Sequence, residues 1–508
     1  MSLTSQRGSG LTLSSAQSDR AAGVLLAMAA GDGLGAGYEF GPPLASDVPV
    51  VMEGGGSFGW AAGEWTDDTS MAIAIAEVSA EGQDLCSVAA QNAIAARWAE
   101  WGSNAKDVGI QTRNVLSAAA RAALERSEPR PSAADLHAAA TALHERTGRT
   151  AGNGSLMRTA PVALAYLGDP EGLAAAATAL SALTHADPEA GEACALWCLA
   201  IRHAVLHGTF DGVRNALDHL PPERAAVWAG RLTEAETHEP AHFDHNGWVV
   251  QALQGAWSAI TRTPVAEDDR STTFAADHLR RALEAAVRGG RDTDTVAAIA
   301  GSLLGARWGA SAVPLSWRRL LHGWPGLRAR DLVRLGVLTA RRGQPDGQGW
   351  PSGVRVDYDT WPERDVLARL PQDEHVWLSG VAPLAGMPAD VTAVVSLCRL
   401  GVDDVPVPAV GSTDHVEVWL VDRPEAKYNP HLDYVLNEAA NMVAELRAEG
   451  KTVLLHCVQA HSRTPAVAAL YASRLTGRSV ADCLQEIQRV LPSAGPNASL
   501  RAALDRLS

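Results

Sequence analysis

The chain has 508 residues, 46% hydrophobic and 20% charged, which is the composition of a globular protein of about two to four domains. Its 43 Lys and Arg residues against 58 Asp and Glu residues give a formal net charge of −15. This charge argues against a protein that binds nucleic acid over its whole surface or coats an anionic membrane.

The chain begins with a predicted tail and continues into a helical domain. Residues 1–18 are mostly Ser, Thr, Gly and Gln without an apolar period, and we predict that they are disordered. Over residues 19–340, Ala- and Leu-rich runs carry apolar residues at three- and four-residue spacing, which predicts a large all-α domain. The clearest predicted helices cover residues 88–101, 134–147, 188–207, 247–260 and 296–308.

The start of the chain gives no sign of a membrane segment. The longest apolar run there, residues 21–31, is too short to cross a bilayer, and nothing before it resembles a signal sequence. We therefore expect a cytoplasmic protein that does not bind membranes.

The pattern changes after the helical domain. Residues 341–371 open with Gly, Pro, Gln and Arg, and we predict a linker there. Over residues 372–508, short β-branched runs alternate with helical stretches, which predicts a compact α/β domain. The predicted strands cover residues 375–381, 391–397, 415–421 and 452–456, and the longest predicted helix covers residues 432–449.

Two clusters of carboxylates and hydroxyls stand just ahead of predicted helices in the first domain. They are Thr66, Asp67 and Asp68, and Asp292, Thr293, Asp294 and Thr295. Either cluster alone is explained by helix capping and the helix dipole. Together they supply four carboxylates, which repel one another unless cations neutralise them, and such hard oxygen donors suit Mg²⁺.

Five motifs in this order resemble the ADP-ribosylglycohydrolase family, which includes the glycohydrolase that reactivates ADP-ribosylated dinitrogenase reductase. They are residues 31–35 with Tyr38 and Glu39, residues 65–69, residues 152–158, Thr184 with His185, and residues 292–297. The resemblance covers residues 19–336. It implies an all-α fold, two Mg²⁺ ions in a central cleft, and hydrolysis of a glycosidic bond in an ADP-ribosylated protein or an ADP-ribose derivative.

The resemblance also implies roles for single residues. The implied metal ligands are Thr66, Asp67, Asp68, Asp292, Asp294 and Thr295. Two cations would polarise the ribose hydroxyls and orient a water, and a carboxylate would take its proton. Glu39, which matches a glutamate on a mobile loop, and Asp292 are the candidate catalytic carboxylates, and the sequence leaves open which one is the base.

Four residues are expected to contact the substrate. Asn153, Gly154 and Ser155 offer backbone amides and a side-chain amide to ribose or phosphate oxygens, and His185 matches a ribose-contacting histidine of the family. On local grounds an ordinary loop and a structural histidine are equally good interpretations. Asp32, in a Gly-rich turn, is interpreted as a structural hydrogen-bonding residue.

The sequence departs from the family pattern directly before Asp292. The family usually has two glycines there, whereas Gly289 and Gly290 are followed here by Arg291. This residue either alters the turn or places a cation near the substrate phosphates.

The second domain contains a cysteine followed six positions later by an arginine. Residues 454–465 run from an apolar strand through Cys457 into a helix that begins near Arg463. This spacing lets the loop fold around a phosphate, with backbone amides favouring the Cys457 thiolate and Arg463 gripping two phosphate oxygens. The other five cysteines fit neither a disulfide nor a zinc framework.

This loop resembles the signature of cysteine-dependent dual-specificity phosphatases over about residues 372–505. The resemblance implies that Cys457 forms a phosphocysteine, Arg463 stabilises the transition state, Thr464 assists release of the thiolate and His456 orients the loop. Asp422 matches the general acid, with Asp433, inside a predicted helix, as the weaker alternative. Ala460 replaces a usual Gly, which leaves an inactive phosphate-binding domain as an alternative.

The sequence therefore predicts a bifunctional hydrolase that acts on ADP-ribosylated and phosphorylated substrates without binding nucleic acid directly. The alternative is an ADP-ribose-binding sensor joined to a catalytically weak phosphate-binding domain.

Overall fold

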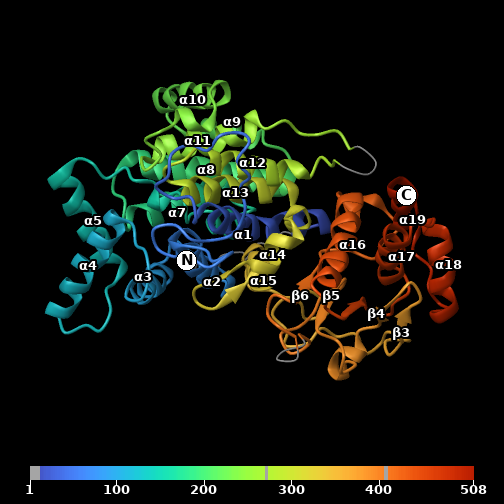
Figure 1. Cartoon of the computed structure of the whole chain (residues 1–508). Helices are drawn as coiled ribbons and strands as arrows, with labels where there is room; N and C mark the ends of the chain where they lie inside the picture. The colour runs from blue at the N-terminus through green and yellow to red at the C-terminus, as the bar shows by residue number, and fades with distance from the viewer. Residues whose placement is uncertain (1–11, 269–272, 406–409) are drawn as a thin grey trace, which may run out of the picture.

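The computed structural model describes residues 12–268, 273–405 and 410–508, which form a helical part and a second part built on a β-sheet (Figure 1). Residues 1–11 of the predicted tail lie outside the described residues. The tail prediction is wrong for its last residues, because helix α1 (Ser15–Gly35) begins there. Ser14 and Gln17 form a capping box, in which each side chain accepts a hydrogen bond from the other residue's backbone amide.

The helical part confirms the predicted all-α fold. Its larger helices are α1, α2 (Asp67–Ala80), α3 (Val88–Gly102), α4 (Ile110–Glu125), α5 (Ala133–Thr147), α7 (Pro170–Ala182), α8 (Pro188–His207), α10 (Pro222–Thr237), α11 (Val249–Arg262), α12 (Asp277–Arg288), α13 (Thr293–Trp308) and α15 (Ala329–Ala340). The shorter elements are α6 (Pro161–Ala165), α9 (Gly212–Asn215), α14 (Leu315–Leu320), β1 (His322–Gly323) and β2 (Leu327–Arg328). The five helices that the sequence predicts are α3, α5, α8, α11 and α13.

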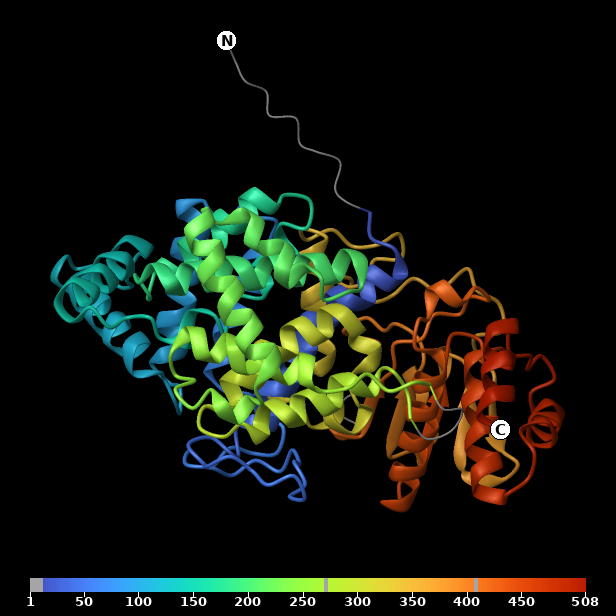
Figure 2. The ribbon, with the colours of Figure 1, turned by 90° about the horizontal axis from the view of Figure 1, so that it is seen from above.

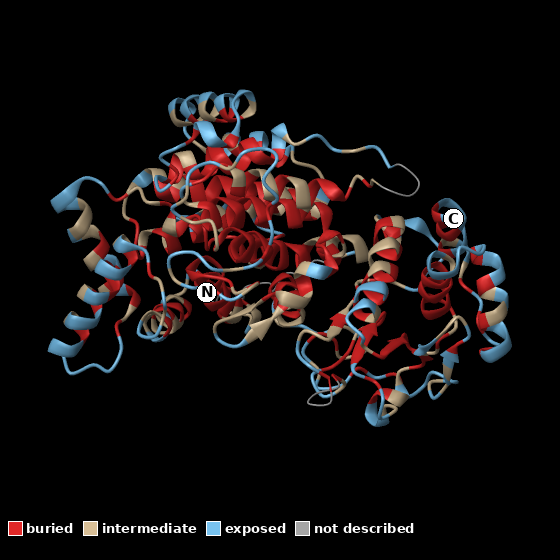
Figure 3. Cartoon of the chain, in the orientation of Figure 1, coloured by how far each residue is buried: buried red, intermediate tan, exposed pale blue. Residues whose placement is uncertain are grey.

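Helices α1 and α13 pack against each other through glycines in the middle of the buried core (Figure 3). A Cβ atom on Gly31 would lie 2.1 Å from the Ala297 carbonyl oxygen, and one on Gly301 would lie 2.2 Å from the Ala27 carbonyl oxygen. A Cβ on Gly35 would lie 2.5 Å from the backbone of Asp294. Only glycine fits at these contacts. The close approach brings the carboxyl end of α1, which carries Asp32, against the start of α13.

The second part contains a five-stranded sheet in the order β3-β4-β7-β5-β6. Its strands are β3 (Leu367–Leu370), β4 (Asp373–Ser379), β5 (Ala393–Ser396), β6 (His415–Glu417) and β7 (Val453–His456). Its helices are α16 (Leu432–Ala448), α17 (Arg463–Thr476), α18 (Val480–Val490) and α19 (Ala498–Leu507). Strands β4, β7, β5 and β6 are parallel, so their carboxyl ends share one edge of the sheet. Cys457 follows the central strand at that edge.

The predicted α/β domain and its four strands are confirmed, but the predicted linker needs correction. Strand β3, antiparallel to β4, lies inside residues 341–371. Trp350, Val356 and Tyr358 in the same stretch are buried, and the Tyr358 hydroxyl donates to the Arg399 carbonyl oxygen at 2.8 Å. Residues 341–371 therefore pack onto the second part.

The two parts lie side by side, with the start of α1 facing the second part in both views (Figure 2). Arg319 forms a 2.6 Å ion pair with Glu449, and the Arg334 guanidinium donates to the Leu400 carbonyl oxygen at 2.6 Å. The Leu315 amide donates to the Glu438 carboxylate at 3.1 Å. Among the described residues, none of the helices has the length and apolar character needed to cross a membrane.

Candidate functional site

The two acidic clusters of the sequence meet where the amino-terminal ends of α2 and α13 come together. Thr66 Oγ1 lies 3.2 Å from Asp68 Oδ2 and 3.4 Å from Asp294 Oδ2. Thr295 Oγ1 lies 3.4 Å from the same Asp68 oxygen. Side chains more than 220 positions apart in the chain thus share one buried site.

Carboxylate oxygens gather there in two overlapping groups. One oxygen each of Asp32, Asp68 and Asp294 lie within 4.8 Å of one another, and so do oxygens of Glu39, Asp292 and Asp294. Asp32 also accepts hydrogen bonds from the Thr66 amide and from Thr69, as a structural residue would. Its place in the first group was missed by the sequence analysis, because a lone Asp in a Gly-rich stretch has no pattern that indicates a ligand.

The buried charges of this site raise one another's pKa. Burial, with repulsion from Asp107 and other carboxylates, raises the pKa of Asp67 to about 8. Burial and repulsion from Asp292 raise the pKa of Glu39 to about 9. Among the described residues, Glu39 Oε2 and Asp68 Oδ1 are buried without a hydrogen-bond donor. Unpaired carboxylate and hydroxyl oxygens form the donor set that hard divalent cations such as Mg²⁺ prefer, so the residues fit such ions.

A cavity of about 540 Å³ opens beside the carboxylates. Glu39, Asp67 and Asp292 line it, together with Asn153 and Gly154 of the short 3-10 helix Asn153–Ser155. The Asn153 side chain donates to Asp292 Oδ2 and to the Asn246 carbonyl oxygen, both at 2.8 Å. This pair of bonds fixes the Asp292 carboxylate at the cavity wall.

Ser155 is not brought to the cavity. Its hydroxyl is buried and lies 2.9 Å from Ser181 Oγ, on the far side of the 3-10 helix. Asp107, in contrast, lines the cavity although it was not among the residues predicted for the site. It stands alone in a loop, so no local pattern marks it.

His185 points its ring into the cavity as a neutral hydrogen-bond donor. Arg158 donates to Thr184 Oγ1 at 2.6 Å, and that hydroxyl lies 2.7 Å from His185 Nδ1. Because Arg158 can only donate, the Thr184 hydroxyl keeps its own hydrogen available for Nδ1, and this arrangement would place the ring proton on Nε2. Burial lowers the pKa of His185 well below its usual value, so the ring stays neutral. A Cβ on Gly154 would lie 3.2 Å from Nε2, so glycine keeps the approach to this nitrogen open.

Arg291 shapes the turn before Asp292. Its φ is +67°, and its amide donates to the Gly41 carbonyl oxygen at 2.8 Å while its own carbonyl accepts from Phe40. The side chain is exposed and does not line the cavity. Of the two interpretations of this departure, the altered turn holds, and it anchors the segment that carries Glu39.

The cysteine loop connects β7 to α17 at the carboxyl edge of the sheet. Cys457 is 2% exposed. Arg463 Nη1 donates to the carbonyl oxygens of Leu397 and Leu420, at 2.6 and 3.2 Å, and its Nε lies 3.4 Å from Asp422 Oδ2. The predicted transition-state arginine and general acid are therefore neighbours.

The loop accommodates Ala460 in a left-handed conformation with φ +56°. Such a conformation costs a residue with a Cβ about 1–2 kcal/mol, so the loop geometry survives the replacement of glycine at that cost. His456 Nε2 lies 2.6 Å from Ser396 Oγ, which lies 2.9 Å from His415 Nε2. The Thr464 hydroxyl is buried without a hydrogen-bond partner in the described parts of the chain.

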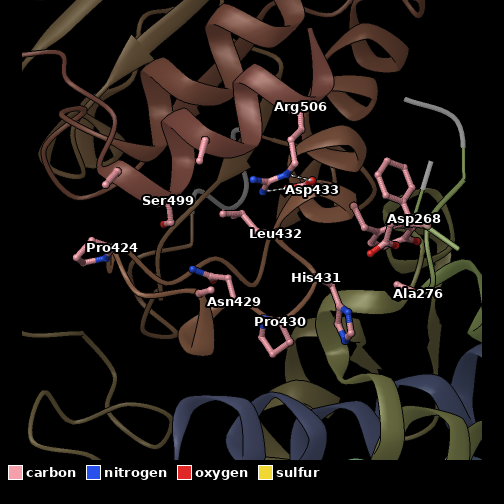
Figure 4. Close-up of a pocket in the computed structure, with 15 residues that line it drawn as sticks. Asp268, Ala276, Pro424, Asn429, Pro430, His431, Leu432, Asp433, Ser499 and Arg506 are labelled. Atoms are coloured by element: carbon pink, nitrogen blue, oxygen red, sulfur yellow. Dashed lines mark hydrogen bonds and ion pairs between the residues drawn. The ribbon is translucent and has the colours of Figure 1, made fainter. Parts of the chain in front are cut away.

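Asp433 is excluded as the general acid by its surroundings (Figure 4). It lies in the first turn of α16, where Arg506 holds both of its oxygens at 2.6 Å. The cavity that it lines, of about 500 Å³, lies between the two parts and does not include Arg463.

Comparisons with known proteins agree with both parts of the fold. A model of the ADP-ribosylglycohydrolase family matches residues 13–346. An ADP-ribosylarginine hydrolase, Tri1, of Pseudomonas putida is 31% identical over 307 residues, which are 59% of this chain and 73% of that protein. Dual specificity protein phosphatase 1 of Arabidopsis thaliana is 29% identical over 90 residues, which are 18% of this chain and 46% of that protein.

Among solved structures, human DUSP28 is 26% identical and covers 28% of this chain and 91% of its own, with a TM-score of 0.23. The family model and the two curated relatives identify an enzyme that hydrolyses ADP-ribosyl linkages and carries a fused phosphatase-like domain. From residue 13 to residue 346, the chain belongs to the ADP-ribosylglycohydrolase family.

Proposed function

We propose that the helical domain, about residues 19–340, is a Mg²⁺-dependent ADP-ribosyl hydrolase whose site is the cavity beside the two carboxylate groups. The observation that supports this is the pair of overlapping carboxylate groups at the cavity wall, the buried group Asp32, Asp68, Asp294 and the partly buried group Glu39, Asp292, Asp294. The ligand set that we propose for two ions is Thr66, Asp67, Asp68, Asp292, Asp294 and Thr295. When bound, the ions supply positive charge that polarises ribose oxygens.

The chain's own residues bind the sugar and move the proton. Neutral His185 donates from Nε2 to a ribose or phosphate oxygen, and Asn153 with the Gly154 backbone holds the substrate against Asp292. Glu39 or Asp292 accepts the proton of the attacking water as the bond at the anomeric carbon breaks. Asn153 fixes Asp292, whereas Glu39 lies on the loop anchored by Arg291.

The substrate that we propose is ADP-ribose attached to arginine in a protein. The relative from Pseudomonas putida, whose name states that linkage, is similar over most of the helical domain.

The test is release of ADP-ribose from arginine-, serine- and O-acetyl-linked substrates, with Mg²⁺ and with chelator. We expect Mg²⁺-dependent release, reduced by about a hundredfold or more in the variant Asp67→Asn with Asp68→Asn, since metal chemistry depends on its ligands. Glu284→Gln, which removes an outlying carboxylate paired with Arg280, serves as the control. Binding of ADP-ribose without release from any substrate would favour the sensor alternative.

We further propose that the second domain hydrolyses phosphate monoesters through a phosphocysteine. The Cys457 thiolate attacks phosphorus, and Asp422 protonates the leaving oxygen as the ester bond breaks. Water, deprotonated by the Asp422 carboxylate, then releases inorganic phosphate and the thiolate, to which Thr464 donates. Arg463 binds the phosphoryl oxygens throughout. The contact between Arg463 and Asp422 at 3.4 Å, beside a buried cysteine that directly follows the central strand, supports this proposal.

Cys457→Ser is expected to abolish hydrolysis of an aryl phosphate. Cys483→Ser, which alters a buried cysteine in α18, is expected to leave the rate unchanged. Unchanged turnover in Cys457→Ser would remove that residue as the nucleophile.

A further inference from the structure

A cleft of about 350 Å³ lies beside Arg463 and Asp422, and both parts of the molecule line it. Arg318 reaches it from α14 of the helical part. Trp350, Tyr358 and Trp361 reach it from the segment that joins the two domains. The space next to the cysteine loop is therefore completed by residues outside the phosphatase-like fold.

The cleft is positively charged in a chain whose net charge is −15. Four guanidinium groups line it, from Arg318, Arg399, Arg423 and Arg463, against the two carboxylates of Glu417 and Asp422. An anionic ligand matches this balance better than a neutral one.

Arg318 makes no direct polar contact through its guanidinium among the described residues. It is 7% exposed, and its guanidinium forms neither a hydrogen bond nor an ion pair within 4 Å there, although Glu417 and Asp19 lie near enough to attract it. A planar guanidinium that faces a cleft with its donors unused suits the oxygens of a phosphate. Arg463 already serves the phosphate that reacts, so Arg318 is available for a second anionic group.

Aromatic rings form part of the same wall. Trp361 is 43% exposed and packs edge-on against Tyr358 at 6.5 Å, so one of its surfaces is free for a flat ring. Arg399 covers Trp350 at 4.4 Å, which places a guanidinium beside that wall. The volume of the cleft falls in the range of small-molecule sites, roughly 300–1,000 Å³.

From these observations we propose that the second domain acts on a phosphorylated nucleotide. The reacting phosphate binds at Cys457 and Arg463, a second phosphate pairs with Arg318, and the base lies against Trp361. A nucleotide is favoured over a phosphopeptide because the cleft combines two phosphate-binding arginines with an exposed ring, and because the first domain handles a nucleotide. This inference rests on the proposed phosphatase activity.

The test compares phosphate release by the full chain from 3′,5′-adenosine bisphosphate, adenosine monophosphate and an aryl phosphate. We expect kcat/KM to be at least about tenfold higher for the bisphosphate than for the monophosphate, as one charge-assisted contact would give. Arg318→Gln should lower kcat/KM for the bisphosphate about tenfold or more and leave the aryl phosphate within about twofold. Arg318→Lys, which keeps the charge but not the planar fork, should fall between the two.

The control is Arg319→Gln. Arg319 neighbours Arg318 on α14 and pairs with Glu449 across the domain interface, but does not line the cleft. An equal loss in Arg319→Gln would mean that loosening the interface, and not the cleft, causes the effect, and would overturn the proposal. Equal losses on the bisphosphate and the aryl phosphate, or a preference for a phosphotyrosyl peptide unaffected by Arg318→Gln, would also overturn it.

A binding measurement separates this proposal from the phosphatase proposal. Calorimetry of 3′,5′-adenosine bisphosphate with Cys457→Ser protein should show binding that Arg318→Gln weakens about tenfold or more. Failure to hydrolyse even the aryl phosphate, with this binding intact, would overturn catalysis but support the cleft. Absence of binding would overturn the cleft whatever the catalytic result.

Discussion

At the scale of single residues, burial shifts the pKa of carboxyls and of imidazoles in opposite directions. In the helical domain, burial raises the pKa of Asp67 to about 8, and repulsion from other carboxylates adds to the effect. In the second domain, burial lowers the pKa of His456 to about 4 and that of His415 to about 3. Folding thus favours protonated carboxyls and neutral imidazoles, so the two kinds of buried group make stability depend on pH in opposite directions.

The metal-free protein is expected to lose stability in its helical domain as pH rises. Because the folded pKa of Asp67 lies above its usual value, the folded state holds the proton more tightly. Its stabilising effect is complete below about pH 4 and is lost as pH rises through about 8. Added Mg²⁺ binds the deprotonated carboxylates and should raise the melting temperature more at about pH 8 than at about pH 6.

Thermal unfolding at both pH values, with Mg²⁺ and with chelator, checks this expectation. The variant Asp67→Asn with Asp68→Asn should show little dependence of the melting temperature on Mg²⁺. A Mg²⁺ effect that is larger at the lower pH would contradict the assignment of these carboxylates as ligands.

Residues in local motifs could be predicted from the sequence, and residues without motifs could not. Asp67, Asp68, Asp292 and Asp294 stand next to helix starts, and the structure brings them together. Asp107 and Arg318 are single polar residues whose positions depend on which distant segments meet. The sequence also placed Ser155 with its neighbours, although the 3-10 helix turns its hydroxyl toward Ser181.

At the scale of elements, the contact between α1 and α13 positions the acidic site. The Thr293 hydroxyl donates to the Gly35 carbonyl oxygen at 2.9 Å, and glycines along both helices allow the backbones to touch. Helices with regular apolar spacing, such as α8, were predicted at their observed ends. Strand β3 was missed because only its last residue, Leu370, is buried, so its sequence lacks the pattern of a core strand.

Gly31→Ala is expected to force α1 and α13 apart. The new Cβ would lie 2.1 Å from the Ala297 carbonyl oxygen, and relieving such an overlap costs about 1–3 kcal/mol. The free energy of unfolding should fall by that amount, and the affinity for Mg²⁺ should fall with it. Denaturant unfolding and calorimetric titration with Mg²⁺ measure the two effects.

Gly230→Ala provides the matched control for Gly31→Ala. Gly230 is exposed in α10, and a Cβ there would meet no atom within 4 Å. This change should raise the free energy of unfolding by up to about 1 kcal/mol, since alanine favours the helix. If both variants gain stability, the close packing of α1 on α13 is not tight enough to exclude a methyl group.

At the scale of the whole molecule, the domains are joined by buried polar contacts. The guanidinium of Arg334, in α15, is buried and donates to the Leu400 carbonyl oxygen at 2.6 Å, and Tyr434 donates to the Ala312 carbonyl oxygen at 3.2 Å. The cleft lined by Arg318 depends on this arrangement. The sequence predicted two domains but not their interface, since no motif marks a surface formed by α14, α15 and α16.

Arg334→Ala is expected to weaken the coupling between the domains. Loss of a buried hydrogen bond from a charged donor costs about 1.5–3 kcal/mol and leaves the Leu400 carbonyl unpaired. In urea, the wild type should unfold in one transition by far-UV circular dichroism and tryptophan fluorescence, and the two signals should separate in the variant. Arg97→Ala, which breaks ion pairs with Glu77 and Glu81 inside the helical domain, should leave them coincident.

The packing of α1 on α13 also sets an order of events during synthesis. Gly35 leaves the ribosome 258 residues before Thr293, so α1 is without its partner while most of the helical domain is made. The carboxylates stay apart and hydrated during that time, and their repulsion arises only when the late helix closes the core. Cations present at that moment can assist the last step of folding, so metal supply in the cell would govern the yield of folded enzyme as well as its activity.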